Sequence, residues 1–471
     1  MEHDYTFPNV QYEILEELYL PTDEEEALEQ LAFNMTGNIE NQESLQHIMS
    51  IDDKEVSAIF SKRYRPSGTL LVQNSFGGAV PLKRAAIQVK TTCWSNVVHT
   101  NDDGYYIVDR RYKDIPTVKL WNRNQTNKTT QRWTEHIGFW VSDNLGKGKT
   151  FNYTIAHTDG SKRDLWVKAT INNAFVIYDD FANKNGIKRP DNVRTWVFSG
   201  SDYGGAPLLH NKAFTSYSYF YPAIASKNNE NFGSKSAKTG ILALSPLMDL
   251  ITSVTLTHKN LPDIIIGTKG KNTSEIYAMV FHETAHYSHK NQVSNGFWAN
   301  VQYQAMFDKT KGTYGDGSPI YSSYTGVAEA WSNFIEYQMM YQSFPNTFSL
   351  ITPLILDSRY NRNMTAYYFS GSTIPSSTGI AADFARWIPS GLLRDLMDND
   401  NNPIQLKCGS DYETTVYSGV DRVSGFTYKQ IYDLLTEDVT SIPRLRDKII
   451  RLYPNRNSNK EITELFKLYG Y

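Results

Sequence analysis

The sequence contains little cysteine, no long apolar run and no excess of charge. Only two cysteines, Cys93 and Cys408, occur in 471 residues, and they lie far apart in the chain. They cannot form a disulfide framework, so they are either free thiols or the two ends of one bridge. No stretch of about 18 uncharged apolar residues occurs, so the sequence predicts no transmembrane helix. The net charge of -3, from 47 Lys and Arg against 50 Asp and Glu, argues against nucleic-acid binding.

The first residues, MEHDYTFPNV, lack the basic and then apolar pattern of an export signal. The connecting segments are rich in Asn, Ser and Thr, and aromatic residues make up 13% of the chain. That composition suits an extracellular, periplasmic or cell-surface protein. We therefore expect a soluble chain, or a mature form whose export signal has been removed. A lipid anchor on the precursor is one option.

The length of the chain predicts several domains, because a domain usually has about 100 to 200 residues. Residues 1–65 contain helical signals and are expected to form a helical lead-in. Residues 66–135 alternate with period two between turn signals, which predicts a small β-sandwich. Residues 136–471 mix strand and helix signals without a repeat, and their end, about 380–471, has apolar residues at helical spacing. The expected fold class is multidomain α+β.

Two motifs in the sandwich region are more specific than the alternation. They are GTLLVQNSFGGAVPLKRAAIQVKT, residues 68–91, and TNDDGYYIV, residues 100–108. Together they resemble the carboxypeptidase regulatory-like domain, a seven-stranded transthyretin-type fold. In that pattern a Pro-Leu turn introduces one strand and a Thr-Asn-x-x-Gly-Tyr turn opens the next. The resemblance implies a module of secreted or surface bacterial proteins, often beside a catalytic domain.

Three of the ten histidines lie within FHETAHYSHK, residues 281–290. His282 and His286 are four residues apart, so on a helix they lie one turn apart on the same face and can bind one ion. Glu283 is turned about 100° around the axis, from where its carboxylate reaches a water on the metal without taking a ligand position. We predict a Zn²⁺ site with Glu283 as general base. The alternative is an ordinary helix with surface histidines.

The residues before this motif predict a strand and a helix start. Asn272 followed by Glu275 has the form of a capping box, and apolar residues recur behind it at helical spacing. The preceding LPDIIIGTKG, residues 261–270, is a short β-branched run between turn residues. Strand, turn and metal helix is the order of elements in zincins. We expect the strand DIIIG, residues 263–267, to align an extended substrate by edge pairing.

A catalytic zinc site takes three protein ligands and leaves the fourth position to water. His289 rises about 10 Å along the axis from His282, so a straight helix cannot bring both of them and His286 to one ion. The metzincin pattern HExxHxxGxxH is not met either, since His289 stands at the Gly position and Gln292 at the last His position. The third ligand must therefore come from elsewhere in the chain.

Three acidic residues downstream are the alternatives for that ligand. Glu329 lies in TGVAEAWSNFIEYQMMY, whose apolar spacing predicts a largely buried helix, and a carboxylate buried there needs a partner such as Zn²⁺. Glu336 is a rival on the same helix face. Asp316, in GTYGDG, matches the GTxxD signature of aspzincins. We prefer Glu329, with Asn333 one turn further on as a hydrogen-bond partner of a histidine ligand.

An HExxH helix followed by a Glu helix resembles the gluzincin group of metallopeptidases. The resemblance implies a second helix antiparallel to the first, with His282, His286 and Glu329 as zinc ligands and Glu283 as general base. It also implies a transition-state donor, Tyr or His, which cannot be chosen among 31 tyrosines.

Three functions follow from these patterns. The first is hydrolysis of a peptide bond in a peptide or protein, and the second is hydrolysis of an amide in a cell-wall peptide or glycopeptide. The third is an extracellular glycan- or protein-binding surface protein with a vestigial or structural zinc site. The presence of Glu283 favours a hydrolase, because a structural zinc site has no use for a general base and is closed by a fourth ligand.

Overall fold

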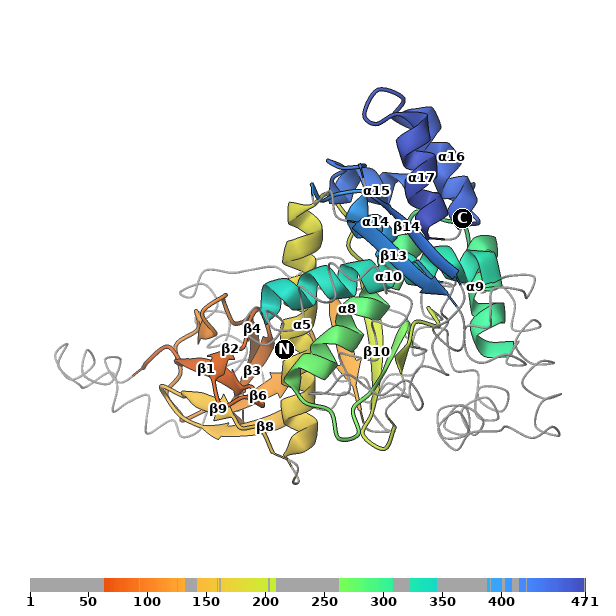
Figure 1. Ribbon diagram of the computed structural model, residues 1–471. Coiled ribbons are helices and arrows are strands. Elements are labelled where there is room, and N and C mark those ends of the chain that lie inside the picture. Colours follow the sequence, from red (N-terminus) through yellow and green to blue (C-terminus); the bar gives the residue numbers. More distant parts are fainter. Residues whose placement is uncertain are drawn as a thin grey trace, which may run out of the picture. The chain divides into compact units, whose positions relative to one another are not determined.

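The structure is a computed structural model of the chain (Figure 1). It describes residues 63–92, 94–124, 126–131, 142–158, 160, 162–201, 204–208, 262–307, 322–344, 388–389, 391–399, 403–408, 415–420, 422–469 and 471. Cys93, Asp316 and all but the end of the lead-in 1–65 lie outside these ranges, and of Cys408 only the backbone is described. The predictions made for these residues stay predictions.

The chain forms two compact units. One includes residues up to Leu71, Pro81–Trp121 and Ser142–Thr154, and the other includes Val72–Val80, Asn122–Val141 and Ile155–Tyr471. Both helices and several sheets are present, which is the mixed α and β content expected for the fold class.

The first unit is built from β-strands. One four-stranded sheet has the order β2 (Ala79–Pro81), β1 (Ser67–Gln73), β5 (Tyr105–Ile107), with β9 (Tyr153–Ile155) also paired to β1. The other has the order β4 (Ser95–His99), β3 (Ala86–Lys90), β6 (Thr117–Trp121), β8 (Ser142–Lys147), with every pair antiparallel. Leu70, Val89 and Val118 are fully buried while their strand neighbours are half-exposed. Period-two alternation thus gives each sheet one buried face.

The TNDDG segment forms the tight turn that its residues predict. The side chain of Asn101 accepts hydrogen bonds from the backbone N–H groups of Asp103 and Tyr105, at 3.0 and 2.9 Å. Gly104 has φ +75°, and a Cβ there would lie 2.3 Å from the carbonyl oxygen of Leu70. Only glycine fits this position, because it tolerates the positive φ and leaves room for the neighbouring strand.

The sheet of the second unit has the order β11 (Gly204–Gly205), β12 (Ile264–Gly267), β10 (Val193–Phe198), β7 (Asn127–Thr130). Strand β10 is parallel to β12 and β7, whereas β11 is antiparallel to β12. Strand β7 thus lies before the expected boundary at residue 135 yet pairs in this unit, while β8 and β9 lie after that boundary and pair in the other one. In β7 the buried Asn127 accepts a hydrogen bond from Thr195 of β10 at 2.8 Å.

Helices make up most of the rest of the described second unit. In chain order they are α5 (Arg163–Lys184), α8 (Thr273–Lys290), α9 (Asn295–Phe307), α10 (Ser322–Ser343), α14 (Leu392–Asp395), α15 (Tyr428–Leu434), α16 (Ile442–Leu452) and α17 (Asn459–Leu468). The C-terminal part, expected to be helical, also contains a hairpin of β13 (Pro403–Cys408) and β14 (Thr415–Val420). Helices α5 and α10 both pack against α8 (Figure 1). Among the residues that the structure describes, no helix has the length and apolar character needed to cross a membrane.

Candidate metal centre

Helix α8 begins where the capping box predicts. Its N-cap, Asn272, accepts a hydrogen bond from the backbone N–H of Glu275 at 3.0 Å, and Glu275 accepts one from the backbone N–H of Asn272 at 2.8 Å. Ser75 also fixes the start of this helix. Its backbone N–H donates to the Thr273 hydroxyl at 2.8 Å, and the backbone N–H of Thr273 donates to the Ser75 hydroxyl at 2.9 Å. These bonds satisfy N–H groups that a helix start leaves unpaired, so the helix is held firmly in register.

The turn before α8 is fixed by an arginine from α5. Arg163 donates from one guanidinium nitrogen to the carbonyl oxygens of Thr268 and Lys271, at 2.8 and 2.9 Å. Helix α5 therefore holds the loop between β12 and α8 in place.

Helices α8 and α10 run antiparallel. Tyr277, early in α8, contacts the ring of Phe344 just past the end of α10, with ring centroids 5.3 Å apart. Later in α8, the carbonyl oxygen of Ala285 accepts a hydrogen bond of 3.1 Å from the indole of Trp331, which is earlier in α10. This arrangement sets the face of α8 that includes His282 against the face of α10 that includes Glu329.

The structure brings His282, His286 and Glu329 into one buried cluster. The Nε2 atoms of the two histidines are 3.1 Å apart, and each lies 3.3 Å from one carboxylate oxygen of Glu329. Ligands about 2.1 Å from a tetrahedral ion lie about 3.4 Å from one another. The 3.3 Å contacts run to different oxygens of Glu329, Oε2 for His282 and Oε1 for His286, and one ligand atom from each residue can be chosen so that all lie within 4.8 Å of one another. These three residues, only 5 to 9% exposed, could hold a metal ion.

The charged groups of the cluster shift one another's pKa values against the effect of burial. Burial alone would raise the pKa of Glu329, but His286 and His282 lower it well below the ordinary range. Burial also opposes a charge on His282, yet its hydrogen bonds to Glu329 and Glu336 raise its pKa well above the usual value. The pKa of His286 is lowered by burial.

Glu283 lies beside the cluster and is only 7% exposed. Burial raises its pKa to about 8, and the charges of Glu329 and Glu336 act in the same direction, whereas that of His282 opposes them. A Cβ built on Gly204 of β11 would lie 3.0 Å from the Glu283 carboxylate and 2.6 Å from the end of Met279. Glycine at position 204 thus lets the sheet approach this carboxylate closely.

The strand expected to pair with a substrate is not at the edge of the sheet. DIIIG forms β12, which pairs with β10 on one side and with β11 on the other. That expectation was wrong because the sequence gives no sign of β11, which consists of Gly204 and Gly205. Within the described sheet, the strand at the edge nearest Glu283 is β11.

The other residues that the sequence offered as a third ligand or as a partner of a histidine ligand lie in different environments. Glu336 contacts Nδ1 of His282 at 3.0 Å, the nitrogen that faces away from Glu329. Asn333 is half-buried, and Asp316 lies outside the described residues. The contact of Glu336 with a histidine is the feature that sequence reasoning missed. Its only signal was the seven-residue spacing from Glu329, which puts both carboxylates on one helix face.

His289 is buried, as are His282 and His286, so the alternative of a helix with surface histidines does not hold. Both ring nitrogens of His289 lack a hydrogen-bond partner among the described residues. Its ring packs against Phe297 and Trp298 of α9, with centroids 5.4 and 6.1 Å away, and burial lowers its pKa to about 3. It is a neutral side chain outside the cluster.

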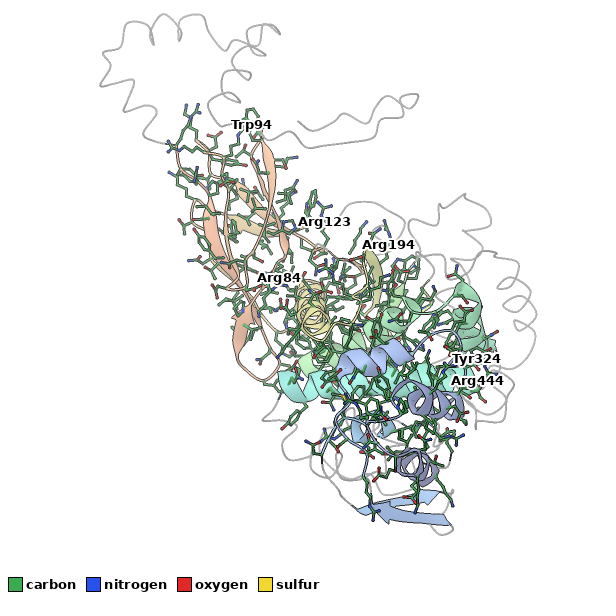
Figure 2. The ribbon with its side chains drawn as sticks, turned by 90° about the horizontal axis from the view of Figure 1, so that it is seen from above. Arg84, Trp94, Arg123, Arg194, Tyr324 and Arg444 are labelled. Carbon is green, nitrogen blue, oxygen red and sulfur yellow. The ribbon has the colours of Figure 1, made fainter. Side chains whose placement is uncertain are left out.

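Helix α9 packs against the part of α8 that includes His286 and His289. The ring of Trp298 lies 5.7 Å from that of His286, and the ring of Phe297 packs edge-on to Tyr324 at the start of α10, labelled in Figure 2. Gln302 of the same helix donates a hydrogen bond of 2.8 Å to the carbonyl oxygen of Ala206, just after β11. The cluster is thereby shielded by aromatic rings, and the strand beside Glu283 is held in place.

No model of a known protein family matches this chain, and no curated protein sequence matches it either. The functional conclusion therefore depends on the geometry and chemistry of the cluster itself.

Proposed function

We propose that the chain is a zinc-dependent hydrolase of the gluzincin type, a metallopeptidase with Glu283 as general base. His282, His286 and Glu329 would hold Zn²⁺. The observation that supports this most is the buried group of two imidazole nitrogens and one carboxylate, all within 4.8 Å of one another, with Glu283 alongside. Two histidines and a glutamate form one of the known ligand sets of catalytic zinc sites.

Zn²⁺ bound there supplies a Lewis acid and lowers the pKa of its water to about 7. The residues of the chain supply the other steps. Glu283 accepts the proton of the attacking water and passes it to the leaving amine.

The substrate class that fits this site is an extended peptide. Strand β11 ends the described sheet beside Glu283, so a peptide that pairs with its free side would be aligned near the general base. Gly204 and Gly205 have no side chains to hinder that approach. An amide within a cell-wall peptide or glycopeptide has the same chemistry and belongs to the same proposal.

The place of action that we propose is outside the cytoplasm, at the cell surface, in the periplasm or in the medium. The support for it is the resemblance of the first unit to the modules of exported proteins. Fractionation of cells that express the full-length gene product, with immunodetection, tests it; recovery in the cytoplasm alone would contradict it.

The test of the function compares wild type with Glu283→Gln, both loaded with Zn²⁺, on a library of peptides and glycopeptides. The variant is expected to keep its zinc and to lose hydrolysis by about 10²- to 10⁴-fold, the usual contribution of a general base. Peptide hydrolysis at an unchanged rate in Glu283→Gln would refute the assignment. A zinc ion with four protein ligands would instead indicate a structural site in a binding protein.

A further inference from the structure

Both ring nitrogens of His282 contact carboxylates of the same helix. Nε2 lies 3.3 Å from Glu329 and Nδ1 lies 3.0 Å from Glu336. The two glutamates are seven residues apart in α10, so they are separated by about 10 Å along the helix axis, with the imidazole ring between them. Glu336 is only 2% exposed.

An imidazole that binds a metal through Nε2 has its remaining proton on Nδ1, and that proton needs an acceptor. The carboxylate of Glu336 is at hydrogen-bond distance from that nitrogen. This contact keeps the proton on Nδ1, leaves Nε2 free to bind the metal and prevents rotation of the ring. A charged acceptor also makes the imidazole a stronger ligand, because it stabilises positive charge on the ring.

The two histidines differ in this respect. Nδ1 of His286 is buried and has no hydrogen-bond partner among the described residues. His286 is instead packed against the indole ring of Trp298, with centroids 5.7 Å apart. Nδ1 of His282 thus contacts a carboxylate, whereas Nδ1 of His286 has only packing contacts among the described residues. If Glu336 matters for the metal, its effect must pass through His282.

A buried carboxylate also needs an explanation of its own. Removing a carboxylate from water is costly unless hydrogen bonds or opposite charge compensate for it. One oxygen of Glu336 contacts His282, whereas the other has no hydrogen-bond partner among the described residues. A purely structural role for Glu336 is poorly supported by one contact.

We propose that Glu336 is a positioning residue, which orients His282 and strengthens it as a metal ligand. The inference rests on the proposed metal site. Hydrogen bonding to a histidine ligand is the role that the sequence pattern predicted for Asn333.

The experiment measures Zn²⁺ affinity by competition with a chromophoric chelator, together with the visible absorption spectrum of the Co²⁺-loaded protein. The proteins are wild type, Glu336→Gln and Glu336→Leu, with Gln342→Leu, at an exposed position of the same helix, as the matched control. Glu336→Leu is expected to bind Zn²⁺ about 10- to 100-fold more weakly, the usual effect of losing such a partner, and to shift the Co²⁺ bands. Glu336→Gln, which keeps an acceptor without the charge, should fall between, and Gln342→Leu should match wild type.

Thermal unfolding of the metal-free proteins separates a ligand effect from a folding effect. If Glu336→Leu does not fold, Glu336→Gln decides. Wild-type affinity together with a wild-type Co²⁺ spectrum in the folded variants would overturn the inference while leaving the metal site intact. Failure of wild type itself to bind Zn²⁺ would overturn both the inference and the proposed function.

Discussion

Two groups of charged residues, one in each unit, differ in burial. In the first unit, Arg84 and Asp102 form a two-pronged ion pair of 2.7 and 2.9 Å, with both side chains well exposed; Arg84 is labelled in Figure 2. In the second unit, His282, Glu329 and Glu336 meet at similar distances but are almost fully buried. The exposed pair is solvated whether or not it forms, whereas each buried group depends on the others. The buried group is therefore the candidate for a functional site, whereas the exposed pair contributes little to stability.

Zinc should affect the two units unequally, and this is the largest effect that we expect. At a free Zn²⁺ concentration of 1,000 times the dissociation constant, the gain in stability is about 4 kcal/mol. Hydrogen exchange should show stronger protection of the amides in α8 and α10, with β3 and β6 unchanged. Equal gains in both units, or no gain, would break the comparison.

Gly204→Ala should reduce catalysis without unfolding the protein. A Cβ at this position would lie 3.0 Å from the Glu283 carboxylate and 2.6 Å from Met279, so the general base must shift. A misplacement of about 1 Å costs about 10²-fold in rate, so a shift of a few tenths of an ångström should cost several-fold. Steady-state kinetics should show the loss in kcat, with zinc content unchanged.

Gly200→Ala is the matched control for that variant, since a Cβ there would meet nothing within 4 Å. Equal kcat values for the two alanine variants would mean that close approach of β11 to Glu283 is unimportant.

Two tryptophans, one in each unit, test how burial affects the free energy of unfolding. The indole of Trp331 in α10 is fully buried and donates to Ala285 of α8 at 3.1 Å, whereas Trp121 in β6 is half-buried and donates to Gln88 at 3.3 Å. Trp331→Phe should lower the free energy of unfolding by about 2 kcal/mol, because it removes buried volume and the indole N–H that donates to the carbonyl oxygen of Ala285. Trp121→Phe should cost less than about 1 kcal/mol. Denaturant titration followed by circular dichroism measures both, and a larger loss in Trp121→Phe would contradict this ranking.

The smallest effect is expected at the exposed ion pair. The hydrogen bond from Arg84 lowers the pKa of Asp102, so the stabilisation is present above the unfolded-state pKa and is lost as pH falls through the folded-state value. Because Asp102 is largely solvated, the pair should contribute less than about 1 kcal/mol. Arg84→Met should therefore reduce stability slightly at pH 7, and the difference should disappear as pH falls through the folded-state pKa of Asp102. A pH-independent difference in unfolding midpoint would show that the charge pair is not its cause.

The parts of the site that sequence reasoning could predict are those set by local periodicity. The capping box at Asn272, the one-turn spacing of His282 and His286, and the burial of the helix around Glu329 all follow from residues close together in the chain. The structure confirms the start of α8 and the buried helix α10. It also brings the three side chains together as the chosen pattern required.

What could not be predicted depends on contacts between distant segments. Strand β7 has the polar sequence NKTT, which lacks apolar alternation, and it pairs with β10, where Asn127 also accepts a side-chain hydrogen bond from Thr195. Strand β11 has two glycines, which give no periodic signal. The pairing of Glu336 with His282 requires the axial register of two helices, which is set by contacts such as that of Trp331 with Ala285.

The central claim is that Glu329 completes a zinc site with the two histidines. Elemental analysis of wild type, Glu329→Ala and Asp316→Ala, each purified in the presence of Zn²⁺ and dialysed alike, tests it most directly. The account predicts one zinc per chain in wild type and in Asp316→Ala, and little or none in Glu329→Ala. Full zinc content in Glu329→Ala, or its loss in Asp316→Ala, would contradict it.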